Sequence, residues 1–321
     1  MREPLRVAVD ARVLGRRGVG RYLANLLRAL VQGREAPFLR LYLGPDSLRE
    51  AVPRHPRVSV EELEGHPAWA EQVLIPRRAR AWGAQVLHYP DNSGALRPGL
   101  PMVLTLHDTM WRRPLGQAIA HPTLRQRLQD RYRKFVCPRA AHAAVRVLTV
   151  SRHSADDIAS TLGLSRDRLR VVAEGVDPVF QSRLAPARAR RMLADLGLDR
   201  PYVLASGAAD RRKNIDRLIQ AFALARRGDP RLAGSLLAIS SLRPGEAATT
   251  TYAATAAAGG GAVYADPLKV EDLARGLSRA CSPQGRAARL IRARARLGRF
   301  SWGASARQHL RAYREAAAGA D

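Results

Sequence analysis

Short apolar runs alternate along this chain with longer stretches in which apolar side chains recur every three or four residues. Such runs predict strands, and the helical spacing predicts amphipathic helices. The predicted strands cover 5–9, 39–43, 58–60, 85–88, 102–106, 145–150, 169–172, 202–206, 235–240 and 261–264, and the predicted helices cover 21–29, 124–135 and 154–162 and begin near 215, 270 and 302. Because strands that alternate with helices build parallel sheets from βαβ units, we predict an α/β fold.

The composition divides the chain into two halves. Its 321 residues, 46% of them hydrophobic, are enough for two domains that each bury a core. We predict a first lobe over 1–182, a linker over 183–200, a second lobe over 201–298 and a C-terminal helix over 299–321. A run rich in Ala, Thr and Gly over 249–261 lacks core-forming side chains, and it predicts a loop or a poorly specified helix.

Charge and cysteine content narrow the class of protein. The net charge of +26 comes almost wholly from arginine, and such a chain attracts phosphates, anionic lipid surfaces or nucleic acid. The arginines are spread along the chain without an RNA-recognition aromatic motif, zinc-finger spacing or helix-turn-helix, so nucleic-acid binding, which predicts steep salt dependence, is the weakest interpretation. Two cysteines form no disulfide framework, and no apolar leader or membrane-length run is present, so we expect a cytoplasmic protein.

The first candidate for an anion site follows the strand predicted at 202–206. Gly207 ends that strand, Arg212 and Lys213 form a cationic turn, and a helix follows with Asn214 placed as its N-cap. The first N–H groups of a helix lack internal partners and carry the positive end of its dipole, so a phosphate tends to settle there. Solvated loop cations are the alternative interpretation.

Other candidates stand where strands end, since ligands of open α/β sheets bind beyond the carboxyl ends of the strands. Gly18 and Gly20 fit either a tight turn or a loop whose backbone approaches an anion. His107 is either a contact to a sugar or phosphate or a buried histidine with satisfied hydrogen bonds. The remaining candidates of this kind are Asp108, Ser151, Arg152 and Glu174. Ser154 and Asp157, three residues apart, predict a helix-capping box and hence a structural role.

Several of these motifs, in this order, resemble those of the family 4 glycosyltransferases. The matching motifs are Val9-Asp10-Ala11-Arg12, Gly18-Val19-Gly20-Arg21-Tyr22, Leu106-His107-Asp108, Val150-Ser151-Arg152-His153-Ser154, Glu174-Gly175-Val176-Asp177 and Arg212-Lys213-Asn214. The resemblance covers about residues 5–225, resumes at 262–267 and runs through 300–302 to 313–315. Several motifs in one order are more specific than any one of them.

The resemblance implies a GT-B-like architecture, in which two Rossmann-like lobes face each other across a cleft. The C-terminal lobe would hold a nucleotide-diphosphate-sugar donor, and the N-terminal lobe would hold a saccharide or lipid-linked acceptor. Lys213 and Arg212 would neutralise the donor diphosphate, Gly18 and Gly20 would line the cleft near it, and His107 would contact the transferred sugar. The family implies retention of anomeric configuration without a metal or other cofactor.

The resemblance also implies a role in cell-envelope or polysaccharide synthesis. The basic surface would favour peripheral contact with the anionic inner face of the cell membrane. Contact of this kind needs no spanning helix, and it is compatible with the cytoplasmic location expected from the cysteine content.

The sequence departs from the family pattern at two places. Glu174 stands where the family has Asn, and its stretch fits a simple turn as well. The family also carries two Glu, eight positions apart, that grip the donor sugar. No such pair is present here, so we expect a shortened C-terminal lobe in which Glu246 is either a remnant of the grip or a turn residue. The alternative function is therefore a degenerate, non-catalytic relative that acts as a binding or partner protein.

Overall fold

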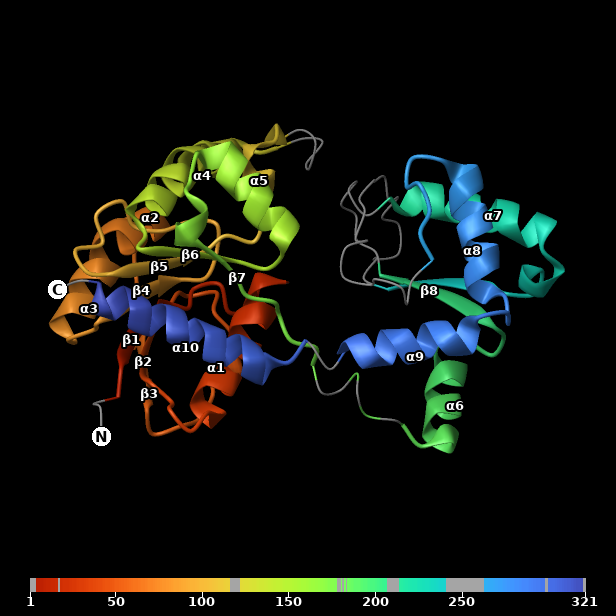
Figure 1. Cartoon of the computed structure of the whole chain (residues 1–321), viewed down its shortest axis with the longest axis horizontal. Coiled ribbons are helices and arrows are strands. Elements are labelled where there is room, and N and C mark those ends of the chain that lie inside the picture. Colours follow the sequence, from red (N-terminus) through yellow and green to blue (C-terminus); the bar gives the residue numbers. More distant parts are fainter. Residues whose placement is uncertain are drawn as a thin grey trace. The chain divides into compact units, whose positions relative to one another are not determined.

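The computed structural model describes residues 4–16, 18–115, 122–177, 180, 182, 184–206, 214–240, 263–297 and 300–319, which belong to two compact units. Unit 1 comprises residues 1–115, 122–177 and 300–321, and unit 2 comprises residues 116–121 and 178–299. The chain therefore leaves unit 1 after Asp177 and returns to it at Phe300, just before the C-terminal helix of Figure 1.

Unit 1 is built on one sheet of seven strands in the order β3-β2-β1-β4-β5-β6-β7. The strands are β1 (Arg6–Asp10), β2 (Phe38–Leu43), β3 (Val58–Glu62), β4 (Val86–Tyr89), β5 (Met102–Thr105), β6 (Arg146–Thr149) and β7 (Leu169–Val171). Each neighbouring pair is parallel, and Val9 of β1 lies in register with Leu41 of β2 and His88 of β4. The seven strands predicted for this half of the chain are confirmed, and their order is that of a Rossmann-type sheet.

The four helices predicted for unit 1 are present with different ends, and two further short helices, α2 (Pro67–Trp69) and α3 (Ile75–Ala81), were not predicted. The predicted four are α1 (Val19–Gln32), α4 (Leu124–Ala143), α5 (Arg152–Leu162) and α10 (Trp302–Ala318), and short 3-10 or π turns lie at Arg49–Ala51, Ala70–Leu74, Met110–Arg112 and Arg166–Arg168. The predicted capping box of α5 is wrong. Ser151 caps the helix by accepting a hydrogen bond from the N–H of Ser154, and the carboxylate of Asp157 accepts one from Thr109 instead.

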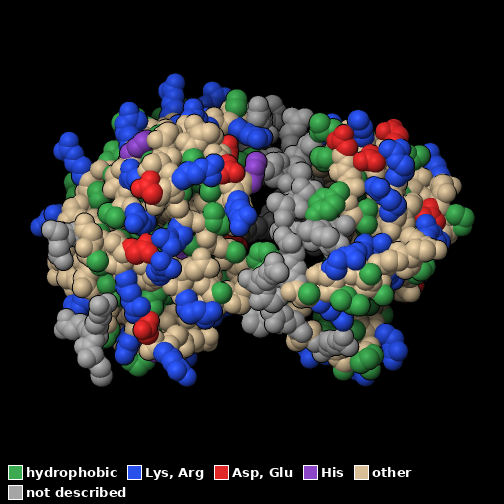
Figure 2. Space-filling view, in the orientation of Figure 1, with side chains coloured by type: hydrophobic (Ala, Val, Ile, Leu, Met, Phe, Trp, Pro, Cys, Tyr) green, Lys and Arg blue, Asp and Glu red, His purple; other side chains and the backbone are tan. Residues whose placement is uncertain are grey.

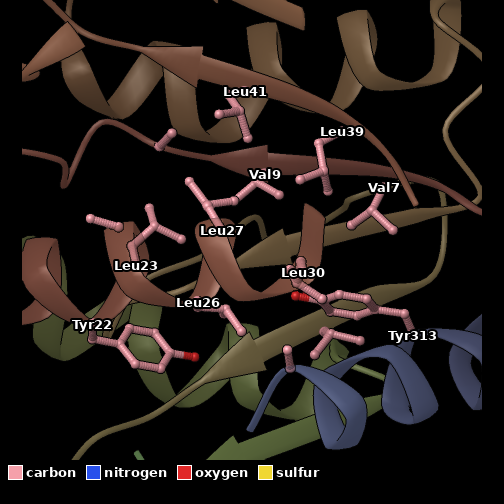
Figure 3. Close-up of a cluster of buried hydrophobic side chains, with 14 of the residues drawn as sticks. Val7, Val9, Tyr22, Leu23, Leu26, Leu27, Leu30, Leu39, Leu41 and Tyr313 are labelled. Carbon is pink, nitrogen blue, oxygen red and sulfur yellow. The ribbon is translucent and has the colours of Figure 1, made fainter. Parts of the chain in front are cut away.

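The two faces of the sheet bury separate apolar clusters, because successive strand residues point to opposite faces. On one face, Leu23, Leu27 and Leu30 lie along one side of α1 at helical spacing. Figure 3 shows these leucines beside Val7 and Val9 of β1 and Leu39 and Leu41 of β2, with Tyr313 of α10 at the edge of the cluster. Residues of α3, α4 and α5 form the other cluster with the opposite face of the sheet.

A chain of buried hydrogen bonds ties α10 to this sheet. The bonded pairs are Tyr313 Oη with His88 Nδ1 (2.9 Å), His88 Nε2 with Thr105 Oγ1 (2.9 Å), Thr105 Oγ1 with Tyr22 Oη (3.3 Å), Tyr22 Oη with His309 Nε2 (2.7 Å), and His309 Nδ1 with the Ser305 carbonyl oxygen (2.8 Å). The carbonyl can only accept, so Nδ1 of His309 donates and Nε2 accepts from Tyr22. With each donor pointing along the chain from Tyr313 to the Ser305 carbonyl oxygen, every hydroxyl group and ring nitrogen has a hydrogen-bond partner when both histidines are neutral.

Unit 2 contains a two-stranded parallel sheet, β8 (Tyr202–Ser206) and β9 (Leu236–Ser240), as predicted for these segments. Its helices are α6 (Pro186–Asp195), α7 (Ile215–Gly228), α8 (Val270–Cys281) and α9 (Arg286–Leu297), with a 3-10 turn at Pro230–Leu232. Helix α6 occupies part of the segment predicted as a linker. A small core forms where α7 packs on α8, around Ala221, Ala225 and Ala274.

Two local predictions for unit 2 need correction. A strand was expected at 261–264. Gly261 and Ala262 lie outside the described residues, whereas Val263 and Tyr264 lie outside regular structure, and the Tyr264 carbonyl accepts a hydrogen bond from Arg279 at 3.0 Å. Asn214 occupies the N-cap position of α7, as predicted, but its side chain makes no capping hydrogen bond. Its Nδ2 donates to the Pro267 carbonyl at 2.6 Å, so Asn214 ties the start of α7 to the segment before α8.

The cationic side chains are scattered over both units. Figure 2 shows Lys and Arg spread across this face rather than gathered in one patch, which agrees with the even spread of arginine in the sequence. Within the described ranges, every helix is too short or too polar to cross a bilayer.

Candidate functional site

His107, Glu174 and Tyr22 meet at the carboxyl edge of the unit 1 sheet. His107 follows β5, Glu174 follows β7, and Tyr22 lies in the first turn of α1. Nδ1 of His107 is 3.7 Å from Oε1 of Glu174, and the His107 ring meets the Tyr22 ring edge to face with centroids 4.9 Å apart. The fold therefore brings together two predicted site residues that are far apart in the sequence.

The hydrogen bonds of His107 determine its tautomer. Its Nε2 lies 3.1 Å from the carbonyl oxygen of Pro90, which can only accept, so Nε2 carries a hydrogen. The backbone N–H of His107 donates to Oδ1 of Asn92 at 3.0 Å. Nδ1 is therefore the ring nitrogen that faces Glu174.

The carboxyl group of Glu174 is partly shielded from water beside His107. The loss of water around the carboxyl group raises the pKa of Glu174, and the charge of His107 opposes that rise. The side chain is still 43% exposed, so it is open to a ligand. Its role in a site stays a prediction, but its position beside His107 distinguishes it from a simple turn residue.

Gly18 directly precedes α1 and Gly20 is the second residue of that helix, and the two glycines meet different requirements. Gly18 stands at the N-cap of α1 with φ 73°, in the region of backbone conformation that favours glycine. A Cβ added there would have no described atom within 4 Å, so this backbone is accessible. A Cβ on Gly20 would lie 2.7 Å from the Val13 carbonyl oxygen, so Gly20 is required by close packing.

The other described candidates divide between structural and exposed positions. Asp108 accepts a hydrogen bond from the N–H of Met110 at 3.0 Å and one from Asn92 at 3.4 Å. Ser151 is the N-cap of α5, and Arg152, the first residue of that helix, is exposed. Gly207, Arg212, Lys213 and Glu246 lie outside the described residues.

A cavity of about 990 Å³ lies beside this corner, and sequence analysis did not foresee it. The residues after β1, β2 and β4 form part of its wall, and α4 supplies another part. Pro90 and Asp91, in the loop after β4, line the cavity, and Pro90 is also the partner of His107. The cavity and the His107 corner therefore share one loop.

The buried part of the cavity is organised around Arg12. Its guanidinium group donates to both carboxylate oxygens of Asp10, at 2.8 and 2.7 Å, and to the Pro67 carbonyl at 2.7 Å. A third carboxylate oxygen, from Glu71, lies 3.4 Å from the same guanidinium group. The bidentate contact is the strongest geometry available to an arginine and a carboxylate, so Arg12 is held in one position.

Glu71 is the most unusual carboxylate of the cavity. Burial raises the pKa of Glu71, and the nearby charge of Asp10 raises it further, while hydrogen bonds from Ser93 and Tyr132 oppose the rise. Ser93 Oγ and Tyr132 Oη both donate to Oε1 of Glu71 at 2.8 Å. The carboxylate thereby joins α4 to the loop after β4.

The sequence held only part of the signal for this cavity. Asp10 and Arg12 follow the first strand in one of the motifs quoted above, but neither was given a role. Glu71 lies in a short helical segment, and its partners Ser93 and Tyr132 are 22 and 61 residues away. Within the described ranges no group of three or more His, Cys, Asp or Glu could hold a metal ion, and the absence of a cofactor stays a prediction.

Solved structures define the class of fold. The chain superposes on a glycosyltransferase from Rickettsia africae ESF-5 with a TM-score of 0.66 at 12% identity, over 98% of this chain and 99% of that one. It superposes on Anabaena Alr3699/HepE, solved in complex with UDP and glucose, with a TM-score of 0.63 at 14% identity, over 97% and 100% of the two chains. The fold is that of the GT-B glycosyltransferases, with a parallel Rossmann-like sheet of seven strands in unit 1, and the shortening of the C-terminal lobe stays a prediction.

The sequence assigns the family within that class. The profile of Glycosyltransferase Family 4 matches residues 16–180, just over half of the chain, and the chain belongs to this transferase family. A curated relative, the MMP alpha-(1->4)-mannosyltransferase of Mycolicibacterium hassiacum, is 30% identical over 185 residues. That match covers 52% of this chain and 45% of the relative, so the chain spans about half the length of the curated relative it matches.

Proposed function

We propose that this protein is a retaining glycosyltransferase that moves a sugar from a nucleotide-diphosphate-sugar to a saccharide or lipid acceptor. The observation that carries the proposal is the shared loop after β4, which places the His107 corner beside a cavity large enough for a small ligand. A curated relative is a mannosyltransferase, and a structural neighbour was solved with UDP and glucose, which supports a nucleotide-sugar donor.

In the proposed reaction, the bond between the anomeric carbon and the diphosphate oxygen breaks. A bond forms from that carbon to the acceptor hydroxyl oxygen, and the hydroxyl proton passes to the leaving diphosphate. Arg212 and Lys213 would stabilise the negative charge on the diphosphate without a metal ion. His107, whose Nε2 is held by Pro90, would contact the transferred sugar through its remaining edge beside Glu174.

The biological setting belongs to the same proposal. We place the enzyme in the cytoplasm, with peripheral contact to anionic membrane through its basic surface, and in cell-envelope or polysaccharide synthesis. The alternative, a non-catalytic relative that binds ligands or partners, is favoured by one observation: the sequence lacks the pair of Glu, eight positions apart, that the family uses to grip the donor sugar.

A thermal-shift titration of UDP, GDP and their common sugars distinguishes the two functions. A ligand that binds only the native state raises the melting temperature, so a donor should give a saturable shift. The shift should vanish in Lys213→Ala and persist in the control Lys269→Ala, which removes another lysine of the same unit. If no nucleotide sugar shifts the wild type, or if both variants lose the shift equally, the enzyme proposal fails.

A further inference from the structure

The two ends of the cavity beside His107 differ in chemistry. At its buried end, the side chains of Asp10 and Glu71 are 8% and 9% exposed, and both contact Arg12. The charge of Arg12 is thereby compensated by carboxylates. Two carboxyl groups against one guanidinium group leave this end without excess positive charge and rich in hydrogen-bond acceptors, so it suits the hydroxyl groups of a sugar rather than an anion.

The exposed end of the cavity is apolar and cationic. Helix α4 contributes Leu124 and Leu128, one turn apart and 73% and 56% exposed, and beside them the exposed Arg125 and Arg133. Leu128 lies four residues after Leu124 and three after Arg125, so these three side chains share one face of the helix, and Arg133 lines the cavity from about two turns beyond Arg125. Leucines that line a cavity and remain this open to solvent favour an apolar occupant.

The arginines of this end carry excess positive charge. Arg16 also lines the cavity, but it pairs with Asp91 at 3.5 Å. Among the described residues, neither Arg125 nor Arg133 is within ion-pair distance of a carboxylate. Asp46 lines the cavity from the loop after β2, so this end holds two arginines against one carboxylate, an excess of one positive charge. An anionic group on the occupant would complement them.

From this arrangement we infer that the acceptor is a lipid-linked anion rather than a free saccharide. Its hydroxyl-bearing part occupies the buried end near Arg12, its phosphate lies between Arg125 and Arg133, and its hydrocarbon chain covers Leu124 and Leu128. A free sugar would leave the leucines exposed and the arginines unpaired. That this ligand is an acceptor rests on the proposed function. Binding of an anionic amphipath to the cavity can be tested without any transfer reaction.

Three probes separate the parts of this ligand. We expect farnesyl phosphate, which has both a chain and a phosphate, to bind the full chain at least about tenfold more tightly than farnesol or mannose 1-phosphate, since each lacks one of the two contacts. Binding is measured by isothermal titration at a fixed ionic strength. Equal affinity for mannose 1-phosphate would mean a phosphate site without a lipid, and equal affinity for farnesol would mean a purely apolar site. Either result overturns the inference.

Variants on the same helix supply matched controls. The double variant Arg125→Ala/Arg133→Ala should weaken farnesyl phosphate binding about tenfold. The control, Arg127→Ala/Arg131→Ala, removes the same charge from exposed positions outside the cavity and should change the affinity less than about twofold. Leu124→Ser with Leu128→Ser should weaken it similarly. Equal losses in both double-arginine variants would show general attraction to anions and refute the site.

Donor binding separates this inference from the proposed function. The cavity variants should keep the nucleotide-sugar shift of the wild type, because Lys213 is untouched. If no nucleotide sugar binds while farnesyl phosphate still discriminates between the variants, the transferase proposal fails and the amphipath site remains. If a nucleotide sugar binds and is transferred to a free saccharide without any response to the variants on α4, the lipid-linked acceptor is wrong.

Discussion

Acid should loosen the attachment of α10 through His309. This side chain is 1% exposed, its Nδ1 donates to a carbonyl, and its Nε2 accepts from Tyr22, so it is neutral in the folded protein. Burial lowers the pKa of His309 to about 4, although its hydrogen bond to Ser305 opposes the change. The folded state therefore binds the proton more weakly than the unfolded state, and acid favours unfolding.

The size of the effect follows from the two pKa values of His309. With about 6.5 in the unfolded chain and about 4 in the folded one, the linkage relation gives a loss of about 2 kcal/mol in the free energy of unfolding between pH 7 and pH 5. The loss continues as the pH falls and ends below the folded pKa. His309→Gln, which has no charge to gain, should lack this part of the acid dependence.

Tryptophan fluorescence during urea unfolding measures this loss in unit 1 alone. The four tryptophans of the chain are Trp69, Trp82, Trp111 and Trp302, and all of them belong to unit 1. The control is His153→Gln, which changes an exposed histidine and should keep the wild-type pH dependence. Parallel pH dependences for the wild type and His309→Gln would refute the reasoning.

Three further predictions follow from the site and its scaffold. Gly20→Ala should destabilise unit 1 by about 1–3 kcal/mol, because the added Cβ meets the Val13 carbonyl oxygen. Gly303→Ala, in the exposed first turn of α10, should stabilise unit 1 by about 0.5–1 kcal/mol. Urea unfolding measures both changes. Arg12→Ala should cost about 3–5 kcal/mol, since it leaves buried carboxylates without their partner, and unchanged unfolding would contradict that role. In Glu174→Gln, the pH profile of kcat/KM should lose the acid limb that a raised carboxyl pKa gives the wild type; an unchanged limb would assign it to another group.

The parallel sheet of unit 1 could be predicted because each of its strands is a short apolar run between helical patterns. The end of α4 could not, since Pro138 normally interrupts a helix. Val136, Cys137, Ala140 and Ala141 are nevertheless buried at helical spacing, and their packing carries the helix on to Ala143. Tertiary packing thus outweighs a local preference, as it does where Thr109 engages the carboxylate expected to cap α5.

Only the part of the candidate site that follows directly from the order of the strands could be predicted. His107 could be placed because it ends a strand, and parallel strands deliver their ends to one edge of the sheet. The cavity could not be placed, because Glu71 acquires its hydrogen-bond partners only when segments from three parts of the chain meet. No local sequence pattern identifies a residue such as Glu71. Of the cavity, only the motif with Asp10 and Arg12 after β1 was noted in the sequence.

The return of the chain to unit 1 has a consequence for synthesis on the ribosome. The surfaces of α1 and β4 that face Tyr313 and His309 are made early, but α10 emerges only after residues 178–299 have been translated. At ~5–20 residues per second this interval is on the order of ten seconds. During that time Tyr22 and His88 lack their hydrogen-bond partners from α10, and unit 2 has time to fold before unit 1 can close.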